Sequence, residues 1–481
     1  MRLYLSPVVV ALVLSGCALA PTHDAKVGAS LASAKAGNIE AAIAQIETQT
    51  QNGNKTDLLL NLEKAELMRI ANQYANSQAA FLVADGNINE WEATAKSEPA
   101  KLMGNVGATI MGDTFRAYEG QDYEKVMLTT RMAMNNIALG DLDTARVDIK
   151  RTHEREAVIA EFRAMQTAEA EKEAEAKGVS ASSTELNGYP VETLNDPDVL
   201  ALKNGYQNAL SHYLSGFVYE ALNEPGLAAP GYRRAIELRP GLPVLEQGLA
   251  GLDQRTGFRR RGGMTDVLFV VETGNAPMRQ SKKLTLPLPI NKGLNVATFT
   301  YPVIYPDSDA LVIKHIAFGD KTLPAAMLAD FNVMARRSLK DEMPGIQIRA
   351  AIRTIAKAAM QNELNKRNPM VGLMGNIAAV ATESPADDRM WRALPGRVFI
   401  ARSFIAPGDY PLAFSELGPE TKTITIGGRH MVVPVRVFHG KIYFGEPAQF
   451  GKLEPASLKA PAAPAPLPAK KTKTTKKPVS A

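Results

Sequence analysis

The amino-acid sequence predicts an α+β protein of several domains. We expect an all-helical first half, an antiparallel, sandwich-like β domain with a helical insertion, and a disordered tail. From 24 to about 254 the chain is rich in Ala, Leu, Glu and Gln, with apolar residues at helical spacing. From 265 onward, short apolar or alternating runs lie between Pro, Gly and Asp, as strands do. The last residues are mostly Ala, Pro and Lys, which bury too little to fold.

These patterns divide the 481 residues into a signal segment 1–17, a helical repeat domain 18–255, a linker 256–264, a β-rich domain 265–452 with a helical insertion at 322–382, and a tail 453–481. The apolar content of 45% is typical of globular proteins. The net charge is +5, but the last 27 residues hold six lysines and no acidic residue, which leaves −1 for the rest. A body without a basic excess predicts no nucleic-acid partner.

The first seventeen residues have the form of a bacterial secretory signal. Arg2 precedes an apolar run from Leu3 to Leu14, which is too short to remain as a membrane-spanning helix. The run ends in Leu-Ser-Gly-Cys at Cys17, a pattern that resembles the lipobox of bacterial lipoproteins. The resemblance implies that Cys17 is acylated and becomes the first mature residue. Ala18 behind it implies the outer membrane, with the body facing the periplasm. Cys17 is the only cysteine, so no intramolecular disulfide is expected.

The segment 209–242 has the clearest repeat pattern. Its six marker residues fall at offsets 8, 11, 20, 24, 27 and 32 of a 34-residue unit: Gly216, Tyr219, Ala228, Tyr232, Ala235 and Pro240. Small residues at 8, 20 and 27 let two helices approach, aromatic residues fill the groove, and proline ends the second helix. The pattern resembles the tetratricopeptide repeat, which implies stacked helical hairpins that bind proteins. Pro225 departs from it, because an aromatic residue is usual in that turn.

Weaker copies lie upstream. One is carried by Ala65, Met68, Tyr74, Ser77, Phe81 and Ala84, and another by Ala133, Gly140, Asp141, Ala145 and Ile149; 25–50 is interpreted as a further helical hairpin. The alternative is an irregular helical bundle. Glu124 is interpreted as the cap of its helix, with a binding carboxylate as the alternative.

In the second half we expect strands at 267–271, 284–288, 296–304, 310–318, 397–402, 410–414, 422–426, 430–438 and 441–444. Helices are expected to interrupt them from about 324 to 365. There Arg349, Arg353 and Lys357 form a basic edge at i, i+4 and i+8, which could contact lipid headgroups or an anionic wall polymer; the alternative is a solvated helix face. The apolar stretch 370–381 is interpreted as a buried core helix, with contact to a bilayer surface as the alternative.

No enzyme motif is present in the sequence. It lacks a G-x-S-x-G elbow, an H-E-x-x-H pair and a phosphate-binding loop, and its six histidines are scattered. His430 and His439, nine residues apart, should point to opposite faces of a strand, which argues against zinc. We therefore expect no catalytic residues, metal or cofactor.

The mature chain resembles an uncharacterised family of proteobacterial outer-membrane lipoproteins with tetratricopeptide-like repeats. We predict a non-enzymatic adaptor in envelope assembly or cell-wall synthesis, whose concave helical face holds an unknown periplasmic or envelope protein. One alternative is an enzyme acting on the cell wall or a polysaccharide, with convergent carboxylates or a His–carboxylate pair in a cleft between the domains. Another is a tether that binds peptidoglycan through the lysine-rich tail.

Overall fold

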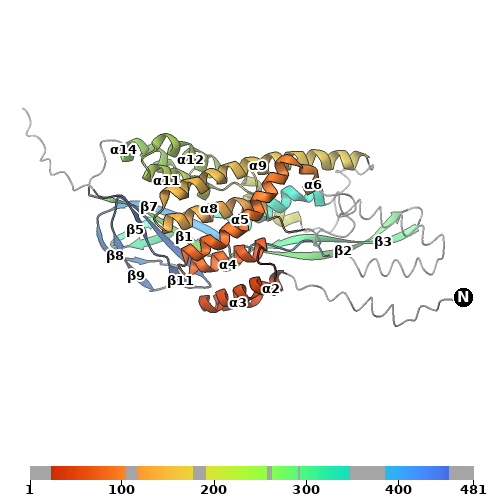
Figure 1. The fold of residues 1–481 in the computed structure, drawn as a ribbon, viewed down its shortest axis with the longest axis horizontal. Helices are drawn as coiled ribbons and strands as arrows, with labels where there is room; N and C mark the ends of the chain where they lie inside the picture. The colour runs from red at the N-terminus through yellow and green to blue at the C-terminus, as the bar shows by residue number, and fades with distance from the viewer. Residues whose placement is uncertain are drawn as a thin grey trace, which may run out of the picture.

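The computed structural model describes residues 23–103, 117–176, 191–256, 263–290, 293–346 and 385–453. Four predicted features lie outside them: Cys17 with the signal segment, the basic edge of Arg349, Arg353 and Lys357, the stretch 370–381, and the tail from 454. Within the described ranges, no helix combines the length and apolar character needed to cross a bilayer. The described elements form an elongated body, with helices along one side and sheets along the other (Figure 1).

The first half is helical, as predicted, and consists mainly of hairpins. The paired helices are α2 (His23–Lys35) with α3 (Ile39–Asn52), α4 (Leu58–Ile70) with α5 (Tyr74–Ser97), α8 (Asp122–Ala138) with α9 (Leu142–Ala176), and α11 (Ala209–Ala221) with α12 (Pro225–Leu238). Shorter helices join or follow them: α6 (Pro99–Met103), η3 (Val191–Leu194), α10 (Pro197–Ala201), α13 (Pro243–Ala250) and α14 (Leu252–Thr256).

The second half forms β-sheets, which confirms the predicted α+β class. The central sheet has the strand order β11-β10-β1-β7-β6, with β12 also paired to β10. Its strands are β1 (Thr265–Thr273), β6 (Ala326–Asp330), β7 (Arg397–Ile405), β10 (His430–Phe438), β11 (Lys441–Phe444) and β12 (Ala448–Phe450). Among the described pairings, β1 with β10 is the parallel one, so the central sheet is mixed.

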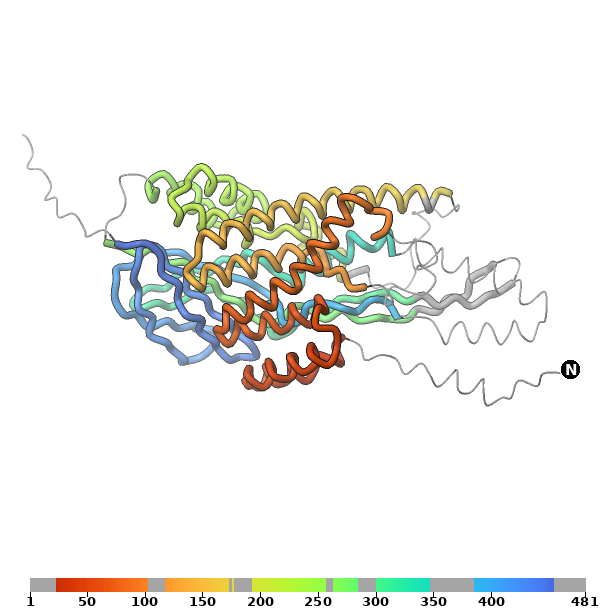
Figure 2. The backbone as a smooth tube through the Cα atoms, in the orientation of Figure 1, coloured from red at the N-terminus to blue at the C-terminus, as the bar shows by residue number. Residues whose placement is uncertain are grey.

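A second, outer sheet packs on the central sheet and gives the sandwich. Its order is β5-β4-β8-β9, with strands β4 (His315–Phe318), β5 (Lys321–Pro324), β8 (Gly408–Ala413) and β9 (Thr421–Ile426). The strands β2 (Met278–Ile290) and β3 (Gly293–Tyr305) form a separate long hairpin, which extends away from the outer sheet along the molecule's long axis (Figure 2).

Strand β1 lies between two cores, which explains its continuous apolar sequence. All nine of its residues are buried. Val267, Phe269 and Val271 pack toward the outer sheet, whereas Leu268 and Val270 belong to the core shared with the helices. A strand covered on both faces needs apolar residues at successive positions rather than alternation.

The predicted helical insertion begins later than expected. The segment 322–330, predicted as its start, lies instead in β5 and β6, and a helix runs over 331–346. Pro324, which suggested a helix start, is the last residue of edge strand β5, a position that tolerates proline. The helix start is marked by Asp330, whose Oδ1 accepts from the backbone N–H of Asn332 at 3.0 Å and Val333 at 3.2 Å.

Candidate functional site

The hairpin α11–α12 places the six marker residues as follows. Ala228, Tyr232 and Ala235 are fully buried, and Tyr219 is half-buried. Gly216 lies so close to Tyr232 that an added Cβ would be 2.6 Å from the ring. Pro240 is exposed, just beyond the end of α12 at Leu238. Pro225 occupies the first turn of α12, where a missing N–H costs nothing.

The same close approach recurs in every hairpin of the described chain. A small residue on the first helix and another twelve positions later are both buried, in the pairs Ser30 with Ala42, Ala65 with Ser77, Ala133 with Ala145, and Gly216 with Ala228. Two of these pairs are also hydrogen-bonded: Ser30 Oγ donates to the Ala42 carbonyl, and Ser77 Oγ to that of Ala65, both at 2.7 Å. These contacts support repeat-like hairpins over an irregular bundle.

The first helices of the last three hairpins lie against the central sheet, so this face does not hold a partner as predicted. Nearly every residue of α4, α8 and α11 is buried. Glu63 of α4 accepts from the backbone N–H of Arg392 at 2.6 Å and of Ala393 at 2.7 Å, just before β7. The expectation of an open groove was therefore wrong for the described structure, because the chain's own sheet covers this face of the helices.

Buried ion pairs cross this helix–sheet interface. Arg402 of β7 donates to Asp266 of β1 at 2.9 Å through Nε and to Glu220 of α11 at 2.9 Å through Nη2. Its Nη1 donates to the Tyr232 hydroxyl at 2.8 Å. Burial by itself raises the pKa of Asp266. The positive charge and hydrogen bonds of Arg402 outweigh this effect, and the pKa lies well below its ordinary value.

A second cluster lies between α8 and the other end of β1. Arg131, with no exposed surface, pairs with Glu66 of α4 at 3.0 Å and with Glu272 of β1. Burial raises the pKa of Glu66. Arg69 and Arg436 lie close by, so three arginines and two glutamates share this buried region. These five residues come from both the helical half and the β half of the chain. A charge buried in this way is costly unless it is paired.

Glu124 acts as the predicted cap and also joins the two halves. Its Oε2 accepts from the Gln121 N–H at 3.0 Å and the Tyr118 hydroxyl at 2.5 Å, which forms the capping contact of α8. Its Oε1 accepts from the Trp391 N–H at 2.7 Å. Burial raises the pKa of Glu124 to about 7.

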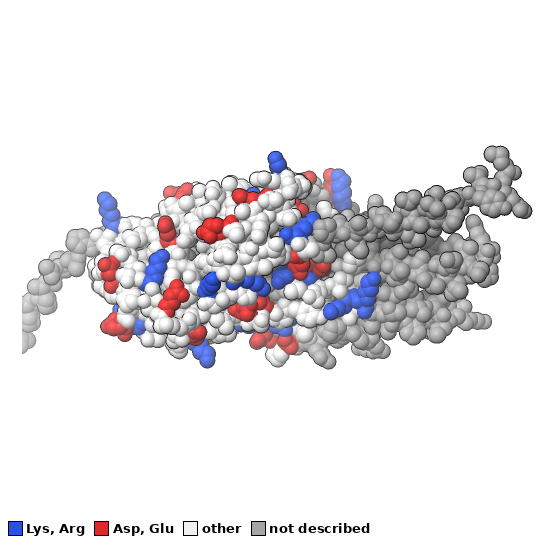
Figure 3. Space-filling view, turned by 90° about the horizontal axis from the view of Figure 1, so that it is seen from below, with Lys and Arg blue, Asp and Glu red and all other residues white. Residues whose placement is uncertain are grey.

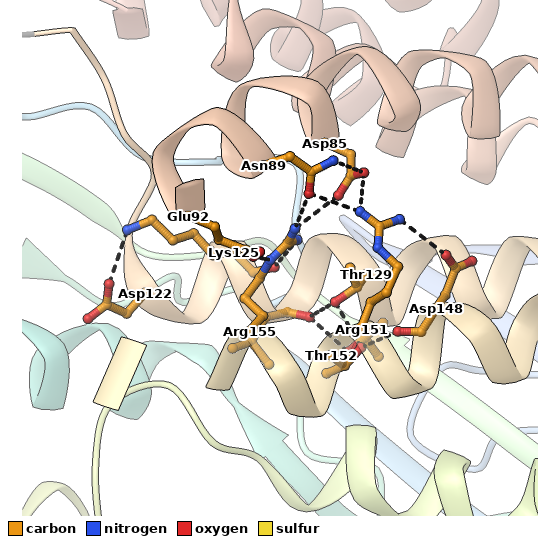
Figure 4. A network of polar contacts seen from close by, with 12 residues as sticks. Asp85, Asn89, Glu92, Asp122, Lys125, Thr129, Asp148, Arg151, Thr152 and Arg155 are labelled. Atoms are coloured by element: carbon orange, nitrogen blue, oxygen red, sulfur yellow. Dashed lines mark hydrogen bonds and ion pairs between the residues drawn. The ribbon is translucent and has the colours of Figure 1, made fainter. Parts of the chain in front are cut away.

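A further polar network joins the second helices α5 and α9 (Figure 4). Arg155 donates to Asp85 at 3.1 Å and Asn89 at 3.2 Å, and pairs with Glu92. Arg151 pairs with the same Asp85. Asp85 lies between two arginines, so this network holds neighbouring hairpins together and offers no free group for chemistry.

A cavity of about 280 Å³ lies where the two halves meet at the base of the β2–β3 hairpin. Its walls come from six separate stretches of chain: 117–121, 163–171 of α9, Arg279 of β2, 300–302 of β3, 341–346, and 386–389. Arginines and carboxylates both line it. It is the feature of the described chain that best fits a small ligand, since the other two cavities are about 20 Å³ each, room for one water.

The possible metal ligands and the charges on one face are both dispersed in the described chain. No cluster of three or more His, Cys, Asp or Glu that could hold a metal occurs among the described residues. His430 is buried beside Asp266, at 3.5 Å, whereas His439 pairs with Asp309 at 2.8 Å. On the face in Figure 3, basic and acidic side chains are interspersed over the described residues.

Comparison with known proteins adds one distant match. No protein-family model matches the sequence, and no curated protein matches it. A crystal structure of a tetratricopeptide repeat protein from Parabacteroides merdae ATCC 43184 is 14% identical, covers 47% of this chain and 96% of its own, and has a TM-score of 0.13. At that score, the assignment of helical repeats depends on the hairpin contacts above and not on this neighbour.

Proposed function

We propose that this chain is a non-enzymatic outer-membrane lipoprotein, anchored through acylated Cys17, whose body holds a partner in envelope assembly or cell-wall synthesis. The observation that carries the proposal is the junction cavity, which is built from both halves and has several of its carboxylates held by arginines. Asp387 pairs with Arg389 at 2.8 Å, and Asp341 with Arg337 at 3.0 Å. Carboxylates held by arginine are suited to fixing a ligand's position rather than to exchanging protons with it.

The cavity replaces the inner helical face as the contact region, since the chain's own sheet covers that face. The sequence of the first seventeen residues supports the membrane anchor, and the lysine-rich tail supports a second contact with anionic peptidoglycan.

In-cell photo-crosslinking tests the proposal. A photoreactive amino acid at Thr167, exposed at the cavity on α9, should capture an envelope protein or wall fragment. Thr48 on α3 is the matched control, because both threonines are exposed and bond the carbonyl four residues back. Equal capture from both positions, or from neither, would contradict the proposal.

Membrane attachment has its own test. A Cys17→Ser variant should leave the membrane fraction and appear in the soluble periplasmic fraction, because no acyl chain can then be attached. A variant that still fractionates with the outer membrane would refute the anchor. Turnover of wall fragments by the purified chain would instead favour the enzymatic alternative.

A further inference from the structure

The junction cavity contains one arginine whose hydrogen bonding differs from that of its neighbours. Arg163 is held in a fork by Asp122, at 2.6 and 3.0 Å, and Arg389 in a fork by Asp387, at 2.8 Å on both bonds. A bidentate pair satisfies both the charge and the geometry of a guanidinium group. Neither arginine needs a ligand to complete its environment.

Arg279, at the start of β2, has a looser environment. It is 6% exposed and lines the cavity. Its Nη2 lies 3.5 Å from Glu342 Oε2, a long contact, and its Nε has no hydrogen-bond partner among the described residues. Glu342 in turn accepts from the Ser338 hydroxyl at 3.1 Å. Leaving a buried donor without an acceptor is unfavourable, because the group has lost its water and gained no partner.

The charge of Arg279 is retained despite its burial. Burial lowers its pKa, but the carboxylates of Glu342 and Asp387 raise it more, and the pKa lies above its ordinary value. A permanently charged guanidinium with an unused N–H therefore borders a cavity of ligand size. An acceptor group on a ligand would complete the hydrogen bonding of this guanidinium.

We propose that the junction cavity binds a small organic carboxylate, with the ligand's carboxylate accepting from Arg279. This deepens the proposed function, on which it rests, by naming the ligand class of the same cavity. The volume of about 280 Å³ suits a dipeptide or a single sugar acid. Both of these ligands carry one carboxylate, which belongs to the C-terminus in the peptide and to the acid group in the sugar.

The other lining charges argue for a singly charged group rather than a phosphate. Three arginines border the cavity, against five carboxylates: Glu119, Glu171, Asp341, Glu342 and Asp387. A dianion would meet a net negative wall, whereas a monoanion paired directly with Arg279 meets much less repulsion. A zwitterion would also find carboxylates for its cationic end.

Binding measurements with matched pairs of probes test this proposal. Alanyl-alanine is compared with its C-terminal amide, and N-acetylmuramic acid with N-acetylglucosamine, which lacks the carboxylate. Isothermal titration calorimetry uses the full mature chain in detergent. We expect one of the acids to bind and its partner without the carboxylate to bind at least tenfold more weakly, and the pair that responds identifies the source. Equal binding of the two members of a pair, tighter binding of inorganic phosphate, or no binding of either acid would overturn the proposal.

Variants separate the role of Arg279 from a general effect on folding. Arg279→Gln should weaken binding of the acid at least tenfold, and Glu342→Gln should strengthen it, because the competing internal carboxylate is gone. If Arg279→Gln does not fold, Thr167→Trp, at the exposed edge of the cavity, should abolish binding while Thr48→Trp leaves it unchanged. Unaltered affinity in Thr167→Trp would also refute the site.

The two proposals fail in different ways. Crosslinks from Thr167 without carboxylate binding would leave the scaffold in place and refute the ligand class. Carboxylate binding without crosslinks would support the cavity and contradict the scaffold.

Discussion

Replacing Arg402 by methionine should destabilise the protein strongly, because this side chain joins three elements inside the helix–sheet interface. Methionine keeps much of the volume and removes the charge. Asp266, 2% exposed, would lose its arginine partner and keep the imidazole of His430 at 3.5 Å as a neighbour. Glu220, with no exposed surface, would keep Arg255, which donates to it at 2.9 Å.

The expected loss is about 3–5 kcal/mol at pH 7, the cost of leaving one buried charge without its partner. Such a loss is a large fraction of the 5–15 kcal/mol that typically holds a domain folded. The loss should shrink as the pH falls toward 4. In the native protein Arg402 holds the pKa of Asp266 low, so this group stabilises the fold fully above its unfolded pKa, and this contribution is lost only as the pH falls through the low folded pKa. Without Arg402, burial raises the pKa of Asp266. At low pH the carboxylate therefore takes up a proton and becomes neutral, so that no unpaired charge remains buried.

Urea denaturation followed by circular dichroism measures the effect. Arg233→Met is the control, because Arg233 is an exposed residue of the neighbouring helix α12 and should change stability by less than about 0.5 kcal/mol. Adding Asp266→Asn to Arg402→Met should recover part of the lost stability, since the buried carboxylate without a partner is removed. A single variant within about 1 kcal/mol of the native protein at pH 7, or a loss that does not depend on pH, would refute the reasoning.

Two further predictions concern Gly216 and Glu124. Gly216→Ala should cost about 1–3 kcal/mol in thermal or urea unfolding, because its Cβ would lie 2.6 Å from the Tyr232 ring, whereas Gly226→Ala, with no atom within 4 Å, should be neutral or stabilising. Equal effects of the two substitutions would contradict the close packing. Burial raises the pKa of Glu124 from 4.5 to about 7, so the folded state holds a proton that the unfolded state releases, and stability should fall by about 3 kcal/mol between pH 4.5 and 7. The difference in unfolding free energy between the native protein and Glu124→Gln should decrease by that amount, and a constant difference would show that Glu124 does not titrate there.

The helical hairpins could be predicted from the sequence because their requirement is local. A small residue must recur at a fixed spacing, as Gly216 and Ala228 do, whatever the rest of the chain does. Most strand positions were predicted for a similar reason, but β5, β6 and β12 were not, and the strand expected over 310–318 begins only at His315. The start of the insertion was not predicted either, because Pro324 favours a helix start and an edge strand equally well, and only its pairing partners distinguish the two.

The buried charges could not be paired from the sequence, since partners such as Arg131 and Glu272 lie 141 positions apart. One signal was nevertheless present. Helix α4 has the sequence LLLNLEKAELMRI, in which Glu63 and Glu66 are surrounded by apolar residues on every side of the helix. A helix of that kind is buried, so its carboxylates must have buried partners. The cavity needed the full structure, because its six wall segments are remote in the chain.

The ion pairs of the interface bear directly on the cavity. Apolar faces can slide or tilt against one another at small cost, but buried ion pairs are favourable only at short distances and defined angles. Arg402, Arg131 and Glu124 each join the helices to the second half, and Glu124 does so at Trp391, two residues from the cavity residue Arg389. The walls contributed by the two halves are therefore held in one arrangement before any ligand arrives. A site fixed in advance loses little conformational freedom on binding, which favours a scaffold that holds its partner without rearranging.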